Sequence, residues 1–80
     1  MYSDDLSRMD MRKLVGQNVR RIRLKKGLTQ ERFAEISGYN QQYLSDLERG
    51  KRNPTIITIY ELANALGVGH LELVRPAKGK

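Results

Sequence analysis

The 80-residue chain contains no cysteine and no tryptophan, and it has a single histidine, His70. The lack of cysteine excludes a disulfide bond, a thiolate nucleophile and a thiolate-ligated zinc or iron–sulfur site. No candidate metal ligand lies three or four residues from His70, so we expect no metal site and no cofactor. No apolar run approaches the roughly 18 residues of a membrane span, and the N-terminus has no apolar block typical of a signal peptide. These absences predict one soluble, cytoplasmic domain held by an ordinary apolar core.

Acidic residues are outnumbered by basic ones, because 15 Lys and Arg against nine Asp and Glu give a formal net charge of +6. Five basic side chains lie in residues 20–26 (RRIRLKK) and three in 49–52 (RGKR), whereas residues 61–74 hold two Glu and no Lys or Arg. A small basic domain attracts polyanions, which are nucleic acid first and anionic membrane second. The uneven distribution indicates that the positive charge lies on one side, and a merely solvated surface is the alternative.

Glycines at 27, 38, 50 and 67 divide the chain into segments of the length of short helices. No window alternates as a half-buried strand does, and apolar residues recur at helical spacing. We therefore predict an all-α fold of five helices in residues 11–74, with flexible ends at 1–10 and 75–80. The expected inward positions are Val15, Val19, Ile22, Phe33, Ala34, Ile36, Leu44, Leu47, Ile59, Leu62, Ala63 and Leu66.

Three polar residues are predicted to cap helices. Thr29 and Asn40 precede the second and third helical segments, and both residue types are favoured at the N-cap. Thr58 and Glu61 have the spacing of a capping box, which predicts that the fourth helix begins after Thr58.

Only residues 38–40 separate the second and third segments, and these are the proportions of a helix-turn-helix. Because the turn is so short, the two helices cross steeply. The start of the third segment can then enter a major groove, which is about 12 Å wide. Gln41, Gln42 and Ser45 fall on its outward side, and a glutamine amide can pair bidentately with adenine. The pattern favours a recognition helix at about residues 40–49, and ordinary surface polarity is the alternative for the glutamines.

Six runs of the chain form a pattern together: residues 15–23 (VGQNVRRIR), 27–30 (GLTQ), 33–34 (FA), 37–38 (SG), 44–54 (LSDLERGKRNP) and 62–68 (LANALGV). This pattern resembles the Cro/repressor-type (XRE-like) helix-turn-helix family, and within it restriction-modification controller proteins and lambdoid phage repressors. The resemblance implies a compact five-helix lambda-repressor-like domain. It also implies a sequence-specific transcriptional regulator that binds a palindromic double-stranded DNA operator as a homodimer.

The resemblance also implies roles for individual residues. Base contacts fall on Gln41, Gln42 and Ser45. Arg23 and Glu48 are expected to form a partly buried ion pair, and Gln30 to brace the recognition helix as well as to bond a phosphate. Further phosphate contacts are implied for Tyr43, Lys51, Arg52 and Asn53.

Two features depart from the pattern that the resemblance implies. Asp46 stands where many relatives carry Gln, Arg or Lys, and its carboxylate would either accept from a cytosine N4 or point away from the DNA. Ile57 and Leu71 stand where relatives commonly have polar residues. With Val74 and Ile59 they are expected to form an apolar dimer interface, and completion of the core is the alternative.

Functions of other classes remain as alternatives. One is an antitoxin or another protein-interaction module, although at most six residues follow Val74. A second is non-specific coating of nucleic acid. A third is membrane-surface binding, which is disfavoured because no segment pairs a basic face with an exposed aromatic face. No enzyme is indicated, because there is no nucleophile–base pair and no phosphate-binding glycine loop. With no ligand domain in view, we expect no small-molecule effector.

Overall fold

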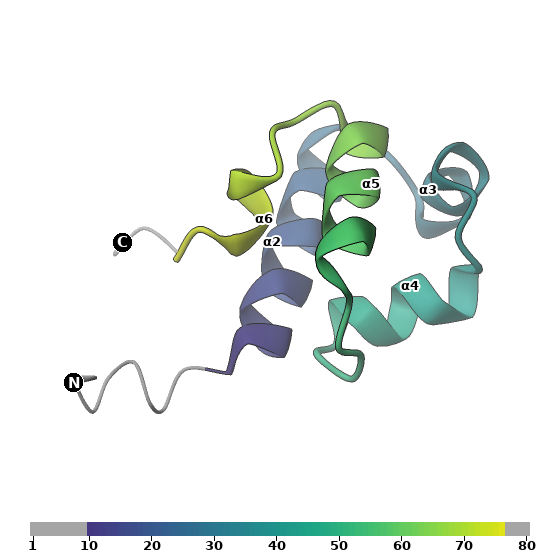
Figure 1. The fold of residues 1–80 in the computed structure, drawn as a ribbon. Helices are drawn as coiled ribbons and strands as arrows, with labels where there is room; N and C mark the ends of the chain where they lie inside the picture. Colours follow the sequence, from purple (N-terminus) through teal and green to yellow (C-terminus); the bar gives the residue numbers. More distant parts are fainter. Residues whose placement is uncertain (1–9, 77–80) are drawn as a thin grey trace, which may run out of the picture.

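The computed structural model describes residues 10–76, and within them the chain forms five helices and no strand (Figure 1). Helix α2 packs against α4 and α6, and α3 packs against α4 and α5. The predicted all-α architecture is confirmed. Between residues 10 and 76 no helix is both long enough and apolar enough to cross a membrane. The helices are α2 (Met11–Lys25), α3 (Gln30–Ser37), α4 (Gln41–Glu48), α5 (Ile56–Leu66) and α6 (Leu71–Val74).

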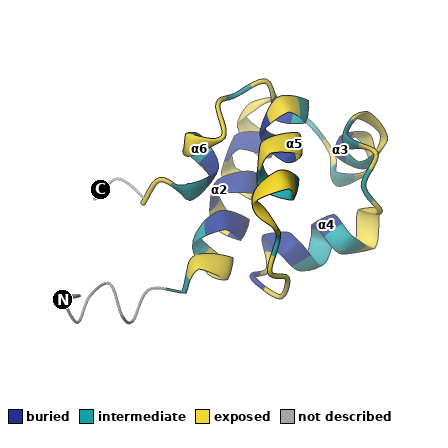
Figure 2. Ribbon diagram, in the orientation of Figure 1, coloured by how far each residue is buried: buried dark blue, intermediate teal, exposed yellow. Residues whose placement is uncertain are grey.

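Every helix contributes to one apolar core, and Figure 2 shows the buried residues on the inward faces. Ile36 is wrong as a core prediction, because 41% of it is exposed. The inward side of α3 is formed by Phe33, Ala34 and Ser37, and Ile36 projects about 100° from the centre of that side. The buried apolar residues are Val15, Val19, Ile22, Phe33, Leu44, Leu47, Leu62, Ala63, Leu66 and Leu73.

Side-chain caps set where the helices begin. The predicted caps Thr29 and Asn40 are confirmed, since their side chains accept from the backbone N–H three residues later at 3.0 and 3.1 Å. The prediction for Thr58 is wrong: Thr55 caps α5, and its hydroxyl accepts from the Thr58 N–H at 3.0 Å. Both threonines suit a cap, but starting at Thr55 adds a helical turn, in which the Ile59 N–H bonds the Thr55 carbonyl.

Two residues that the sequence assigns to flexible ends belong to the folded domain. Asp10 caps α2 by accepting from the Arg12 N–H at 3.1 Å, and the hydrogen bond from the Arg12 side chain lowers the pKa of Asp10. The Arg75 carbonyl accepts from Asn18 at 2.9 Å. The same amide of Asn18, which is 2% exposed, donates to the Leu73 carbonyl at 2.9 Å and so fastens α6 to α2. Pro76 is exposed, and the other residues of the predicted flexible ends, 1–9 and 77–80, lie outside the described residues.

Candidate nucleic-acid interface

The turn between α3 and α4 has the geometry of a helix-turn-helix. Helix α3 ends at Gly38, whose φ of 79° lies in the left-handed region that favours glycine. After two intervening residues α4 begins at Gln41, and it runs across the lower edge of the molecule in Figure 1. Leu44 and Leu47 on its inner side are buried, so its opposite side is left facing outward.

Gly16 lets α4 lie directly against the backbone of α2. A Cβ atom at this position would be 2.3 Å from the Leu47 carbonyl oxygen and 2.9 Å from that of Glu48. Backbone atoms cannot move aside as a flexible side chain can. The end of α4 is therefore fixed at the surface of α2 by a contact that only glycine permits.

A buried ion pair anchors the same end of α4, as predicted. Arg23 donates from Nε to Glu48 Oε2 at 2.6 Å and from Nη2 to Glu48 Oε1 at 3.0 Å. The two side chains are only 8% and 2% exposed. Arg23 also donates to the Leu28 carbonyl at 2.8 Å, and the Gln30 amide donates to Glu48 Oε1 at 3.1 Å. Gln30 therefore braces α4 as expected, and the ends of α2, α3 and α4 are joined by one polar network.

Aromatic residues hold the other end of α4. Tyr39 in the turn donates its hydroxyl to Glu61 at 2.6 Å and lies 3.2 Å from the Thr58 hydroxyl. The hydrogen bond to Glu61 raises the pKa of Tyr39 above its ordinary value of 10.0. The Tyr43 ring stacks on the Tyr39 ring with 5.6 Å between centroids, and the Arg52 guanidinium lies 5.0 Å from the centroid of Tyr43. No local pattern predicts the hydrogen bond from Tyr39 to Glu61, which lies 22 residues away.

The predicted base-contact residues share the outer side of α4. Gln41 and Gln42 are exposed, and Ser45 is half-buried one turn later. Asp46 lies beside them, and its carboxylate is paired with neighbouring side chains. It accepts hydrogen bonds from Gln42 at 3.1 Å and from Arg49 at 2.6 Å. Arg49 was missed as a member of this group, although its spacing from Ser45 and Asp46 places it on the same side.

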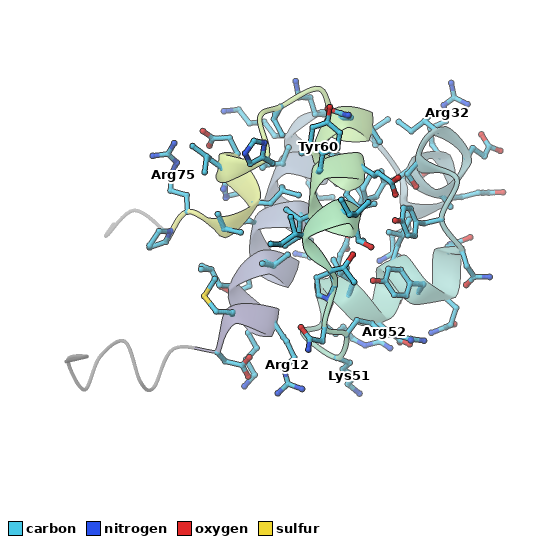
Figure 3. All side chains as sticks on the ribbon, viewed as in Figure 1. Arg12, Arg32, Lys51, Arg52, Tyr60 and Arg75 are labelled. Atoms are coloured by element: carbon cyan, nitrogen blue, oxygen red, sulfur yellow. The ribbon has the colours of Figure 1, made fainter. Side chains whose placement is uncertain are left out.

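The predicted phosphate contacts in the α4–α5 loop lie at one edge of the molecule. Lys51 and Arg52 lie with Arg12 at the lower edge in Figure 3. The loop passes close to the start of α2, since a Cβ atom at Gly50 would be 2.8 Å from Lys13 Cγ. Asn53 is exposed in the same loop.

The basic run at residues 20–26 lies elsewhere, which corrects the expectation of a single positive side. Lys13 is near the start of α2 and faces the α4–α5 loop, whereas Lys26 follows its end and approaches Gly67. The 15 residues of α2 span about 22 Å, so the two basic runs lie at opposite ends of that helix. Residues far apart in sequence decide which charges share a surface, and local composition could not reveal this.

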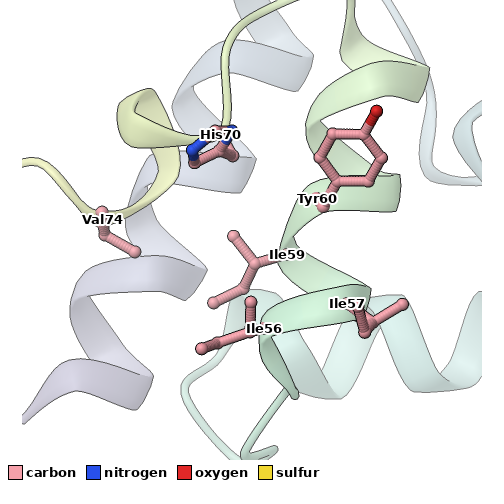
Figure 4. A pocket seen from close by; sticks show the side chains of 6 residues that line it. All are labelled: Ile56, Ile57, Ile59, Tyr60, His70 and Val74. Carbon is pink, nitrogen blue, oxygen red and sulfur yellow. The ribbon is translucent and has the colours of Figure 1, made fainter.

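An apolar surface lies on α5 and α6. Ile57, which is 63% exposed, and the half-buried Val74 line one groove with Ile56, Ile59, Tyr60 and His70 (Figure 4). Leu71 follows His70 and is 61% exposed. Ile57 and Leu71 therefore do not complete the core. We refer to Ile56, Ile57, Tyr60, Leu71 and Val74 as the α5–α6 face.

Comparisons with known proteins agree with this architecture. The sequence pattern of the helix-turn-helix family matches residues 19–73. The chain is 69% identical over 68 residues to an uncharacterised HTH-type transcriptional regulator, y4dJ, of Sinorhizobium fredii, covering 85% of this chain and 88% of that protein.

Solved structures of controller proteins share the fold. The restriction-modification controller protein C.AhdI of Aeromonas hydrophila is 40% identical with a TM-score of 0.74, over 78% of this chain and 94% of that one. The controller protein C.Esp1396I, whose tetramer is solved in complex with its natural 35-base-pair operator, is 33% identical with a TM-score of 0.73, over 79% and 83% of the two chains. The chain therefore belongs to the helix-turn-helix family of transcriptional regulators.

Proposed function

We propose that this protein regulates transcription by binding a palindromic operator as a homodimer, with α4 in the major groove of each half-site. One observation carries the proposal: α4 is fixed at both ends while its outer side is left free. Glu48 and Tyr39 anchor the two ends, and Gln41, Gln42 and Ser45 face outward. A recognition helix held at both ends loses little conformational freedom when it binds DNA, so its contacts discriminate between bases.

The proposed contacts divide into two kinds. Gln41, Gln42 and Ser45 contact base edges and carry the sequence preference. The other contacts go to phosphates and position the protein, which makes binding strongly dependent on salt. The phosphate-contact residues are Gln30, Tyr43, Lys51, Arg52 and Asn53.

The α5–α6 face supplies the dimer interface in this proposal. Its exposed side chains carry no charge, and we assign the interface to Ile57, Leu71 and Val74. One small module has little area with which to hold DNA, whereas two modules on half-sites about 34 Å apart combine their affinity and specificity. The operator complex of C.Esp1396I supports operator binding by an oligomer of this fold.

Protein concentration sets operator occupancy in this scheme. A regulator of this kind acts where the DNA is, in the cytoplasm, and the outcome follows from blocking or recruiting polymerase at a promoter. No small-molecule effector and no catalytic step is needed. A metabolite that shifts the binding curve at fixed protein concentration would refute this part of the proposal.

Selection of bound duplexes from a random DNA pool at about 150 mM salt tests the function. The wild type, a Gln41→Ala/Gln42→Ala variant and a Gln17→Ala control are compared, because Gln17 is also an exposed helical glutamine but lies on α2. We expect the wild type and the control to enrich one palindrome that the double variant does not enrich. If the wild type enriches nothing, the proposal of a sequence-specific regulator fails.

A further inference from the structure

A carboxylate on the outer side of α4 poses an electrostatic problem for a helix that enters DNA. An unpaired Asp46 would be repelled by the phosphates on both sides of the groove. In the structure Gln42 donates to it at 3.1 Å and Arg49 at 2.6 Å, and the Arg52 guanidinium forms an ion pair with it at 3.6 Å. With two guanidinium groups against one carboxylate, this cluster has a net positive charge. Asp46 therefore acts on its neighbours and not directly on DNA.

Arg49 is the neighbour whose position is most closely defined. Its backbone lies just past the end of α4, yet its side chain runs back along the helix. Nη1 donates to Ser45 Oγ at 2.9 Å, and Nη2 donates to Asp46 Oδ1 at 2.6 Å. The guanidinium is therefore level with Ser45, one turn closer to Gln42 than its own backbone. The side chain is 53% exposed, so the group remains accessible from outside.

We propose that Arg49 is a further base-reading residue of α4 and that Asp46 is a positioning residue that aims its guanidinium, which also donates to the neighbouring base-contact residue Ser45. The inference rests on the proposed function and adds a specificity determinant to it. A guanidinium has five N–H donors, and the bonds to Ser45 and Asp46 use two of them. The base edge that accepts two donors in this geometry is the O6 and N7 pair of guanine.

Gln42 belongs to the same arrangement. Its amide donates one N–H to Asp46, which leaves the amide oxygen and the second N–H for a base. The Asp46 carboxylate thus orients two neighbouring base-contact groups, the Gln42 amide, which suits adenine, and the Arg49 guanidinium, which suits guanine. The half-site is expected to contain a guanine close to the position read by Gln42.

Single-base-pair variants of the enriched operator distinguish base reading from a phosphate contact. Affinities are measured for the wild type and for Arg49→Ala, with Arg52→Ala as the control because Arg52 also pairs with Asp46 but is a proposed phosphate contact. We expect Arg49→Ala to abolish a preference for guanine of about tenfold at one position of each half-site and to preserve preferences elsewhere. Arg52→Ala is expected to weaken all duplexes alike and to lower the salt slope by about one.

The positioning role of Asp46 is tested by Asp46→Asn, alone and combined with Arg49→Ala. We expect Asp46→Asn to reduce the preference at the guanine position and to have no further effect there once Arg49 is alanine. A uniform loss of affinity in Arg49→Ala identifies Arg49 as a phosphate contact and overturns the inference while the proposed function stands. If Asp46→Asn does not fold, as judged by circular dichroism, the position-specific result for Arg49→Ala decides alone. If the wild type enriches no duplex, the proposed function and the inference both fail.

Discussion

The outer side of α4 and the α5–α6 face differ in how far contacts within one chain hold them in place. Helix α4 is held by directional polar contacts, and within the described residues no buried side-chain nitrogen or oxygen lacks a hydrogen-bond partner. The α5–α6 face has no such contacts to direct it, and Ile56 there is 81% exposed. Polar contacts fix position, whereas apolar surface left in water favours association without fixing it. Contacts within one chain thus hold the outer side of α4 in place, whereas the α5–α6 face is left apolar and exposed and is the surface that we propose a second copy covers.

Loss of the ion pair under α4 should have the largest effect on stability. Glu48→Leu would leave Arg23 buried without its partner, and we expect the free energy of unfolding to fall by about 3–5 kcal/mol. Urea denaturation monitored by circular dichroism measures the loss. The double variant Arg23→Met/Glu48→Leu should recover most of it, since no charge is then stranded. A single-variant loss as small as that of the exposed pair Arg32–Glu35 would show that the network does not anchor α4.

The close contact at Gly16 is the next most sensitive point. Alanine is intrinsically better than glycine inside a helix by about 1 kcal/mol. At Gly16 the clash with two carbonyl groups should outweigh this gain, for a net loss of about 1–3 kcal/mol in the free energy of unfolding.

Gly69→Ala is the matched control for this substitution. A Cβ atom there meets nothing within 4 Å, and the φ of Gly69 is not positive, so stability should hardly change. Equal thermal stability of the two alanine variants would contradict the close approach of α2 and α4.

Which of these contacts follow from the sequence depends on how local they are. Thr29 and Asn40 were correctly predicted as caps because a cap is decided within four residues. The choice of Thr55 over Thr58 was missed, since both suit the role and Glu61 bonds Tyr39, 22 residues away.

The candidate site shows the same division. The Arg23–Glu48 pair was accessible only through the resemblance to a family, because 25 residues separate its members. The separation of the two basic runs and the burial of Asn18 depend on how helices pack, and no local pattern encodes either of them.

The hydrogen bond from Tyr39 contributes a smaller effect at the other end of α4. Tyr39→Phe should lower the free energy of unfolding by about 1 kcal/mol near neutral pH. Because folding raises the pKa of Tyr39, its contribution is present below pH 10 and is lost as the pH rises through the folded pKa. Denaturation at a series of pH values measures this, and a Tyr39→Phe difference that grows above pH 10 would contradict the assignment.

The α5–α6 face should show the smallest effect on monomer stability and a large one on assembly. Ile57→Ser/Leu71→Ser removes side chains that are already exposed, so the unfolding free energy of the monomer should change by no more than about 0.5 kcal/mol. Sedimentation equilibrium should show that this variant no longer dimerises, whereas Leu24→Ser, at a residue 50% exposed on α2, still does. Dimerisation of both variants alike would place the interface elsewhere.

In the proposed complex two copies bind one palindrome, and each presents a fixed α4 to its half-site. The most direct test of this arrangement inserts about five base pairs, half a helical turn, between the half-sites of the enriched operator. We predict that the affinity falls to that of a single half-site, because the second α4 then faces the wrong side of the duplex, and that an insertion of about ten base pairs restores part of it. Unchanged affinity after the half-turn insertion would contradict binding by two copies with fixed recognition helices.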